Sequence, residues 1–252
     1  ARVMVNRIWQ HHFGRGIVAT PSNFGKLGDA PTHPELLDYL ASRFIESGWS
    51  IKMIHREIML SATWQLSTQP DESNAQIDAD NRYLWQMTRR RLDVEAWRDA
   101  VLDVSGRLDR SFGGPSTNLA DANNVRRTVY AKVSRHNLDS LLRLFDFPDA
   151  NITSSKRSET TVPQQQLFVL NSPFMIAQAK AFSTRIHNNA PENNEARINL
   201  AFRLAYGRPP EDIEVELARS FVSGGRDPQS KLSRWESYAQ VLLGSNEFMY
   251  LD

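Results

Sequence analysis

The sequence contains no cysteine in its 252 residues. This absence excludes disulfide bonds, thiolate metal sites and a cysteine nucleophile, and it fits a protein that is exported to an oxidising compartment. The sequence also has no apolar run near the roughly 20 residues that span a bilayer, so we expect no membrane-spanning segment.

Net charge is almost absent as well. The 30 Lys and Arg residues balance 29 Asp and Glu residues, which leaves a formal charge of +1. Such a chain has no overall attraction to nucleic acid or to an anionic membrane, and we expect no nucleic-acid partner. The chain opens on "ARVMVNRIWQ", with neither an initiator methionine nor a signal-peptide pattern, which favours a segment of a longer protein.

The familiar catalytic and ligand-binding motifs are missing too. "FGKLGDAP" lacks the Gly-Lys-Ser/Thr ending of a phosphate-binding loop, and "DADN" and "NLADANN" lack the glycine and distal glutamate of an EF-hand calcium loop. The sequence has no Gly-x-Ser-x-Gly elbow and no dinucleotide fingerprint. Hydrolase and dehydrogenase assignments therefore have no support from motifs.

Helical periodicity is what the sequence does contain. In 31–49, Thr32 and Glu35 have capping-box spacing before an apolar stripe, and Ser50 is placed to cap a second helix. Further helices are predicted over 93–110, from Thr161, from Ser172, and in three segments that end at Gly207, Gly224 and Gly244. We expect a mainly α, multi-helix, bundle-like fold.

One segment has the pattern of a strand instead. In "VRRTVYAKV", residues 125–133, valines alternate with polar or aromatic residues. A single strand needs a partner, and "YLWQMTRRR", residues 83–91, is the best candidate. The sequence therefore predicts a minor two-stranded β element.

The strongest signal for a domain boundary is the loop "FPDANITSSKRSETTVP", residues 147–163, which is rich in Ser, Thr, Asp and Pro. It would separate a front helical section with the small β element, residues 1–150, from a C-terminal helical section, residues 151–252. A single continuous domain is the alternative.

The segment "NRIWQHHFG" concentrates two of the six histidines. On a helix His12 continues an apolar stripe, whereas His11 points about 100° away, so the pair cannot converge on one metal ion. A remote histidine, His33 or His55, would be needed to complete a site. We therefore favour a buried, hydrogen-bonded His12 with a structural role over an acid-base or ligand role, and expect no bound transition metal.

Arginine is unusually frequent relative to lysine. Only six of the 30 basic residues are lysine, which leaves 24 arginines. The planar guanidinium suits bidentate pairing with carboxylates and partial burial. We favour a lattice of ion pairs in which Arg98 and Arg107 face Glu95, Asp99 and Asp103 at helical spacings.

An anion-binding groove is the other interpretation of the arginines. It would form where the run Arg89, Arg90 and Arg91 meets Arg126 and Arg127 across the predicted strand pair. Neighbouring residues on a strand point to opposite sides. We therefore expect Arg91 to point inward and to pair with Glu95 or Asp99, and Arg90 to remain available to an anion.

Five ordered blocks of sequence resemble one family. These blocks are "ARVMVNRIWQHHFGRGIVATPSNFG", "PTHPELLDYLASRFIESGWSIKMIHREIMLSATWQ", "RRRLDVEAWRDAVLDVSGRLD", "RSETTVPQQQLFVLNS" and "LLGSNEFMYLD". The chain is similar to a planctomycete-associated domain of unknown function that occurs toward the C-terminus of large exported proteins. The resemblance implies export, a multidomain parent, and a c-type haem elsewhere in that parent, since this segment has no Cys-x-x-Cys-His and no cofactor of its own. Trp64 stands where such sequences are expected to carry tyrosine.

Two functions remain open. In the first, favoured hypothesis the chain is a non-catalytic interaction module that docks to other domains of its parent or to an extracellular anionic ligand, such as a polysaccharide. In the second it is an enzyme domain, acting on polysaccharide or coupled to redox chemistry, with a site built from His11, His12, Arg90, Arg91 and Glu95. A module predicts arginines neutralised by acids and buried histidines, whereas an enzyme predicts a cleft where His, Arg and Glu converge.

Overall fold

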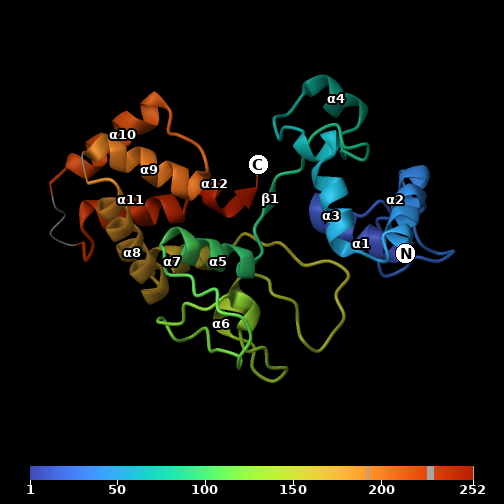
Figure 1. Cartoon of the computed structure of the whole chain (residues 1–252), viewed down its shortest axis with the longest axis horizontal. Coiled ribbons are helices and arrows are strands. Elements are labelled where there is room, and N and C mark those ends of the chain that lie inside the picture. The colour runs from blue at the N-terminus through green and yellow to red at the C-terminus, as the bar shows by residue number, and fades with distance from the viewer. Residues whose placement is uncertain (192, 226–229, 252) are drawn as a thin grey trace. The chain divides into compact units, whose positions relative to one another are not determined.

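A computed structural model gives the protein a mainly helical fold with a minor two-stranded antiparallel sheet, which confirms the predicted fold class (Figure 1). The structure describes residues 1–191, 193–225 and 230–251. The chain divides into two compact units, Ala1–Arg90 (unit 1) and Arg91–Leu251 (unit 2). None of the described helices is both long and apolar enough to cross a membrane.

Unit 1 is a small helical body with its own core. Its elements in chain order are α1 (Arg2–Phe13), α2 (Pro34–Glu46), α3 (Ile51–Met59), the 3-10 turn η1 (Ala62–Gln65) and α4 (Glu72–Ile77). Ser50 caps α3 as predicted, because its hydroxyl accepts the N–H of Met53. Thr32 does not cap α2, because its hydroxyl donates to the carbonyl of Ile17 instead. The core side chains are Val5, Ile8, Trp9, Phe13, Ile17, Val18, Leu37, Leu40, Phe44, Ile54 and Ile58.

A buried asparagine joins α1 to the loop that follows it. Asn6 is 1% exposed; its amide nitrogen donates to the carbonyl of Val18 at 3.1 Å, and its Oδ1 accepts the N–H of Val18 at 2.8 Å. Gly16 permits this approach, because a Cβ at that position would lie 2.7 Å from Nδ2 of Asn6. Asn6 thus satisfies both backbone groups of Val18, which burial would otherwise leave unpaired.

Unit 2 contains the remaining helices and the sheet. Its elements are β1 (Arg90–Arg91, at the boundary), α5 (Val94–Val104), η2 (Thr128–Tyr130), α6 (Ser140–Leu144), α7 (Pro163–Asn171), α8 (Pro173–Asn189), α9 (Asn194–Tyr206), α10 (Asp212–Ser223), α11 (Arg234–Leu243), α12 (Asn246–Met249) and β2 (Tyr250–Leu251). The longest of these helices, α8, lies alongside α11 and α5 (Figure 1).

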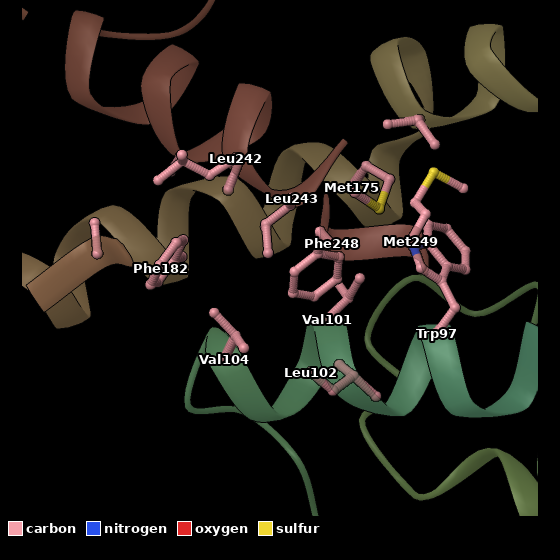
Figure 2. Close-up of a cluster of buried hydrophobic side chains, with 14 of the residues drawn as sticks. Trp97, Val101, Leu102, Val104, Met175, Phe182, Leu242, Leu243, Phe248 and Met249 are labelled. Carbon is pink, nitrogen blue, oxygen red and sulfur yellow. The ribbon is translucent and has the colours of Figure 1, made fainter. Parts of the chain in front are cut away.

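The core of unit 2 lies between α5, α8 and the C-terminal helices. Figure 2 shows Trp97 and Val101 of α5 facing Phe248 and Met249, with Phe182 of α8 lining the same space. These side chains are almost fully buried, with Val101 and Phe182 at 0% exposure. At roughly 1.5–3 kcal/mol for each fully buried apolar side chain, this cluster is the main stabilising contribution to unit 2.

The division between the units lies at Arg90–Arg91 and not near residue 150, where the loop composition predicted it. The loop 147–163 lies within unit 2, because the helices on either side of it share one core. Leu142 and Phe145 precede the loop, Val169 follows it, and all three belong to the same buried cluster. A polar loop thus covers one continuous core without separating two domains.

The sheet also differs from the predicted pairing. β1 falls inside the predicted segment 83–91, but its partner is β2. Residues 125–133 form no strand; they contain η2 and two isolated parallel bridges, Asp109 with Arg126 and Thr117 with Ala131. The alternation of valines was misleading, because Val129 and Val133 are exposed and bury no face of a sheet.

Helix α5 ends earlier than its periodicity predicted. It ends at Val104, and Gly106 adopts a left-handed conformation with φ +76°. Glycine favours such a position because it has no Cβ to clash, so Gly106 terminates the helix that was expected to continue to residue 110.

Replacing Asn6 tests its role in pairing both backbone groups of Val18. Asn6→Ala leaves the N–H and C=O of Val18 buried without partners, and we expect unit 1 to lose about 2–6 kcal/mol of stability, at about 1–3 kcal/mol for each lost partner. The measurement is urea unfolding followed by helical circular dichroism. Arg7→Ala, an exposed change one residue along α1, is the matched control and should leave the midpoint unchanged. Equal midpoints for the two variants would contradict the prediction.

Candidate ligand-binding site

The two adjacent histidines lie on different faces of α1, as the helical spacing predicted. His11 is exposed, whereas His12 is 8% exposed and its Nε2 lies 2.7 Å from Nδ1 of His55 on α3. One ring donates this hydrogen bond and the other accepts it. Trp64 packs edge-on against the His12 ring at a centroid distance of 5.0 Å. His55, and not His33, is therefore the remote partner of His12.

Arg90 holds the C-terminal end of α1. One terminal nitrogen of its guanidinium donates to the carbonyls of His11 at 2.5 Å and His12 at 2.8 Å. These carbonyls lack helical partners, and the end of a helix carries partial negative charge. We expected Arg90 to remain available to an anion, but its guanidinium is hydrogen-bonded within unit 1.

The surroundings of His12 oppose its protonation. Burial, then the neighbouring His55, Arg90 and His11, lower the pKa of His12 from 6.5 to about 4. Desolvation disfavours the charged imidazolium, and nearby positive groups act in the same direction. His12 therefore remains neutral at physiological pH, as a structural hydrogen-bonding group requires.

Arg91 is structural, as predicted, but its partner is Asp146 and not Glu95 or Asp99. A nitrogen of Arg91 lies 2.8 Å from Oδ2 of Asp146, with side chains that are 10% and 13% exposed. The guanidinium also donates to the carbonyl of Thr160 at 2.5 Å and to Oε1 of Gln165 at 3.1 Å. Asp146 in turn accepts the N–H and the hydroxyl of Thr160. This Arg91 network ties both ends of the loop 147–163 together.

Glu95 and Arg98 also have partners other than those predicted. Both oxygens of Glu95 accept from Arg157, at 2.7 and 2.8 Å. Arg98 is 1% exposed and donates to the backbone carbonyls of Asn124 and Arg126 and to the hydroxyl of Thr128. Helical spacing predicted carboxylate partners for Arg98. Instead, the face of α5 that carries Arg98 packs on an irregular segment whose backbone carbonyls accept from the guanidinium.

Arg126 and Arg127 do not form the predicted groove with Arg91. Arg126 donates to the carbonyls of Gly113 and Pro115 and stacks on the ring of Tyr130 at 4.3 Å. Arg127 is more exposed and lies 3.7 Å from Asp99. The groove required residues 125–133 to pair with the arginine strand, and that pairing does not occur.

A cleft elsewhere in unit 2 gathers basic side chains that the sequence did not single out. It has a volume of about 350 Å³ and is lined by Ser134, Arg135, His136, Leu138, Arg143, Phe147, Asp149, Ala150 and Asn151. We call it the arginine cleft. Within the described residues, the side chains of Arg135, His136 and Arg143 have no hydrogen-bond or ion-pair partner, and all three are exposed.

Local structure explains how the cleft forms. Asp139 caps α6 by accepting the N–H of Leu141, and the buried Leu141 and Leu142 fix that helix on the core, so Arg143 projects from its outer side. The amide of Asn151 donates to the carbonyl of Arg135, which holds the two walls together at 3.1 Å.

The chemistry of the cleft suits an anion. Two guanidiniums outnumber the one carboxylate, Asp149, whose Oδ1 is occupied by the N–H and amide of Asn151. Arginine forks bind carboxylate, sulfate and phosphate in bidentate geometry. Leu138, Phe147 and Ala150 add apolar surface for the body of a ligand. The signal in the sequence was "SRHN" followed by an arginine on a short helix, which is too weak to distinguish from surface charge.

No three His, Asp or Glu side chains converge on a possible metal position within residues 1–191, 193–225 and 230–251. Of the histidines considered for the opening segment, the structure brings His12 and His55 together. Glu95 belongs to unit 2, whereas both histidines belong to unit 1.

A protein-family model described as "Protein of unknown function (DUF1553)", PSD1, matches residues 1–222. The match covers most of the sequence, and the chain belongs to this family. No curated protein and no solved structure matches the sequence. The description of the family names no reaction and no ligand, so function must be argued from the geometry of the site.

The Arg91 network yields a first prediction for this site. Arg91→Ala removes one partner from a largely buried pair and should cost about 3–5 kcal/mol, as should Asp146→Ala. Because both variants break the same contact, the double variant should cost much less than the sum of the two. Urea unfolding of all four proteins gives the coupling energy. Additive losses would contradict a direct interaction between the two side chains.

The His12–His55 pair yields a prediction about pH. Because the pKa of His12 is lowered in the folded state, its contribution is complete above pH 6.5 and is lost as pH falls from 6.5 toward 4. At about 1.4 kcal/mol per pKa unit, the loss approaches about 3 kcal/mol. Urea midpoints measured from pH 7 to pH 4 should fall more steeply for the native protein than for His12→Gln. Parallel pH profiles would refute the assigned role.

Proposed function

We propose that the chain is a non-catalytic binding module of an exported multidomain protein and that it holds an anionic ligand in the arginine cleft. The observation that carries this proposal is the set of basic side chains in one cleft, Arg135, His136 and Arg143, without partners among the described residues. Arginines elsewhere in unit 2, such as Arg91 and Arg98, are engaged by the fold itself.

The ligand we propose is an acidic sugar unit of an extracellular polysaccharide. A volume of about 350 Å³ lies at the lower end of the range for small-ligand pockets. A sulfate or carboxylate group would bind between Arg135 and Arg143, and the apolar face of the sugar ring would contact Leu138 and Phe147. The hydroxyl of Ser134 and the ring nitrogens of His136 offer hydrogen bonds to the sugar hydroxyls.

The alternative, an enzyme built on His11, His12, Arg90, Arg91 and Glu95, has less support. Such a site needs side chains that are free to act on a substrate. Instead His12 is bonded to His55, Arg90 binds backbone carbonyls, and both oxygens of Glu95 are bound by Arg157. These contacts favour a binding role over a catalytic role for the chain.

Export and the wider architecture are part of the same proposal. The chain belongs to the DUF1553 family, and its sequence blocks resemble a planctomycete-associated domain of large exported proteins. The absence of cysteine is compatible with an oxidising compartment. A c-type haem of the parent protein would lie outside this segment, because its attachment requires cysteines that the chain lacks. Other domains of the parent would then be its nearest protein partners.

Calorimetry with a sulfated oligosaccharide derived from heparin tests the ligand assignment. We expect binding that weakens as salt concentration rises, because exposed charges are screened. The double variant Arg135→Ala/Arg143→Ala should weaken this binding by about a hundredfold or more, since each of the two arginines loses a charged hydrogen bond that contributes about 1.5–3 kcal/mol. Inorganic sulfate serves as a second probe, and binding of sulfate alone would assign the cleft to a small free anion.

The matched control is Arg203→Ala, which removes an exposed arginine of α9 that has no partner among the described residues. It should leave affinity unchanged. A neutral oligosaccharide of equal length should not bind. Equal affinity of the native protein and the double cleft variant for the sulfated probe would overturn the proposal.

A further inference from the structure

His136 lies in the arginine cleft with two arginines and one carboxylate. It lines the cleft together with Arg135, its neighbour in the chain, with Arg143 of α6, and with Asp149 of the loop 147–163. Its side chain is exposed and makes no hydrogen bond or ion pair with any group of the described residues. The fold itself therefore does not engage the ring of His136, which is available to a ligand.

This availability distinguishes His136 from histidines that the fold uses. Nε2 of His12 lies 2.7 Å from Nδ1 of His55, and Nδ1 of His187 lies 2.8 Å from the carbonyl oxygen of Ser183. In those rings a change of protonation alters a hydrogen bond of the folded chain. A change in the charge of His136 disturbs no such bond within the described residues, so its consequence falls on a bound ligand.

The charged groups that face His136 carry no excess of negative charge. Arg135 and Arg143 supply two permanent positive charges, and Asp149 supplies one negative charge. Asp139, at the start of α6, is not part of the lining, and its carboxylate caps that helix. A positively charged imidazole ring in this cleft would thus find its counter-charge in a bound anion and not in the protein.

Histidine is the residue type in the cleft that changes charge near neutral pH. Arginine stays charged, and carboxyl groups ordinarily lose their proton below about pH 5, whereas histidine titrates between about pH 5 and 8. Protonation converts the ring from one donor and one acceptor into two donors. An opposite charge nearby favours the charged form of an ionisable group. An anion bound between the arginines should therefore favour proton uptake by the ring beside it.

We infer that the arginine cleft takes up a proton at His136 when it binds its anion, so that an acidic polysaccharide is held more tightly at mildly acidic pH than at mildly alkaline pH. The inference rests on the proposed function, because it requires an anion in the cleft. Coupling between two ligands is reciprocal, so an anion that promotes protonation is itself bound more tightly by the protonated cleft.

The direction of the pH dependence follows from this coupling. The gain in affinity is complete at acidic pH, where the ring is already protonated before the anion binds, and it is lost as pH rises and the bound complex gives up the proton. A charged hydrogen bond contributes more than a neutral one, and the difference corresponds to an affinity gain of about five- to tenfold. A neutral ring that bound only sugar hydroxyls would give no such gain.

Calorimetry with the heparin-derived sulfated oligosaccharide tests the inference, because sulfate esters keep their charge throughout the range. Titrations near pH 6.5 in buffers of different ionisation enthalpy give the number of protons taken up for each ligand bound. We expect uptake of up to about one proton. Between about pH 8 and about pH 5.5, the range in which histidine titrates, affinity should rise about five- to tenfold. Circular dichroism at each pH verifies that the protein stays folded.

Two histidine variants assign the proton. His136→Gln keeps a hydrogen-bonding side chain that does not titrate, so it should remove the proton uptake and flatten the pH profile. His11→Gln, at an exposed histidine of unit 1, should retain both. Binding without proton uptake, or uptake that persists in His136→Gln, would overturn the inference.

The double variant Arg135→Ala/Arg143→Ala separates this inference from the proposed function. If the native protein binds the oligosaccharide at neither pH, or binds it as tightly as the double variant does, the arginine cleft is not the site, and both proposals fail. If binding depends on the two arginines but not on pH, the proposed function stands and only the role of His136 is refuted.

Discussion

Arginine guanidiniums bound to backbone carbonyls and to one aspartate hold the irregular segments of unit 2 in place. Long polar loops carry carbonyls that neither helix nor sheet satisfies, and a guanidinium can donate to several of them at once. Arg98 does this for residues 124–128, and Arg91 does it for the loop 147–163 together with Asp146. This requirement explains why arginine outnumbers lysine so strongly, since an ammonium group on a flexible stem cannot span several acceptors in a fixed plane.

The need to satisfy loop carbonyls separates structural arginines from those available to ligands. Arg90, Arg91, Arg98 and Arg126 all turn toward the protein and donate to groups within it. Arg135 and Arg143 lie on a wall of the arginine cleft that the Arg91 network helps to position, because Asp146 and Phe147 are adjacent in the chain. The binding function that we propose for the cleft thus depends on a structural arginine that would not touch the ligand.

Much of the fold could be predicted, and less of the site. Helix positions followed from capping residues and apolar spacing, as at Ser50 and Ser172, where each hydroxyl accepts the expected N–H. The buried His12 followed from its place on the stripe of α1. The sequence did not predict the partners of Arg91 and Glu95. Helical spacing identifies only charged residues nearby in the chain, whereas Asp146 lies 55 residues from Arg91 and Arg157 lies 62 residues from Glu95. The cleft residues gave only a weak pattern in the sequence, which could not be distinguished from surface charge.

The sequence by itself determined the helical class, the absence of thiol chemistry, and the inward stripe of helices such as α1, because these depend on composition and on local periodicity. Only the tertiary structure decided where the chain divides, which strand pairs with Arg90–Arg91, and which arginines keep their charge available. Those outcomes depend on contacts between distant segments. A buried guanidinium binds whichever oxygen the packing brings to it, and no local pattern specifies that oxygen.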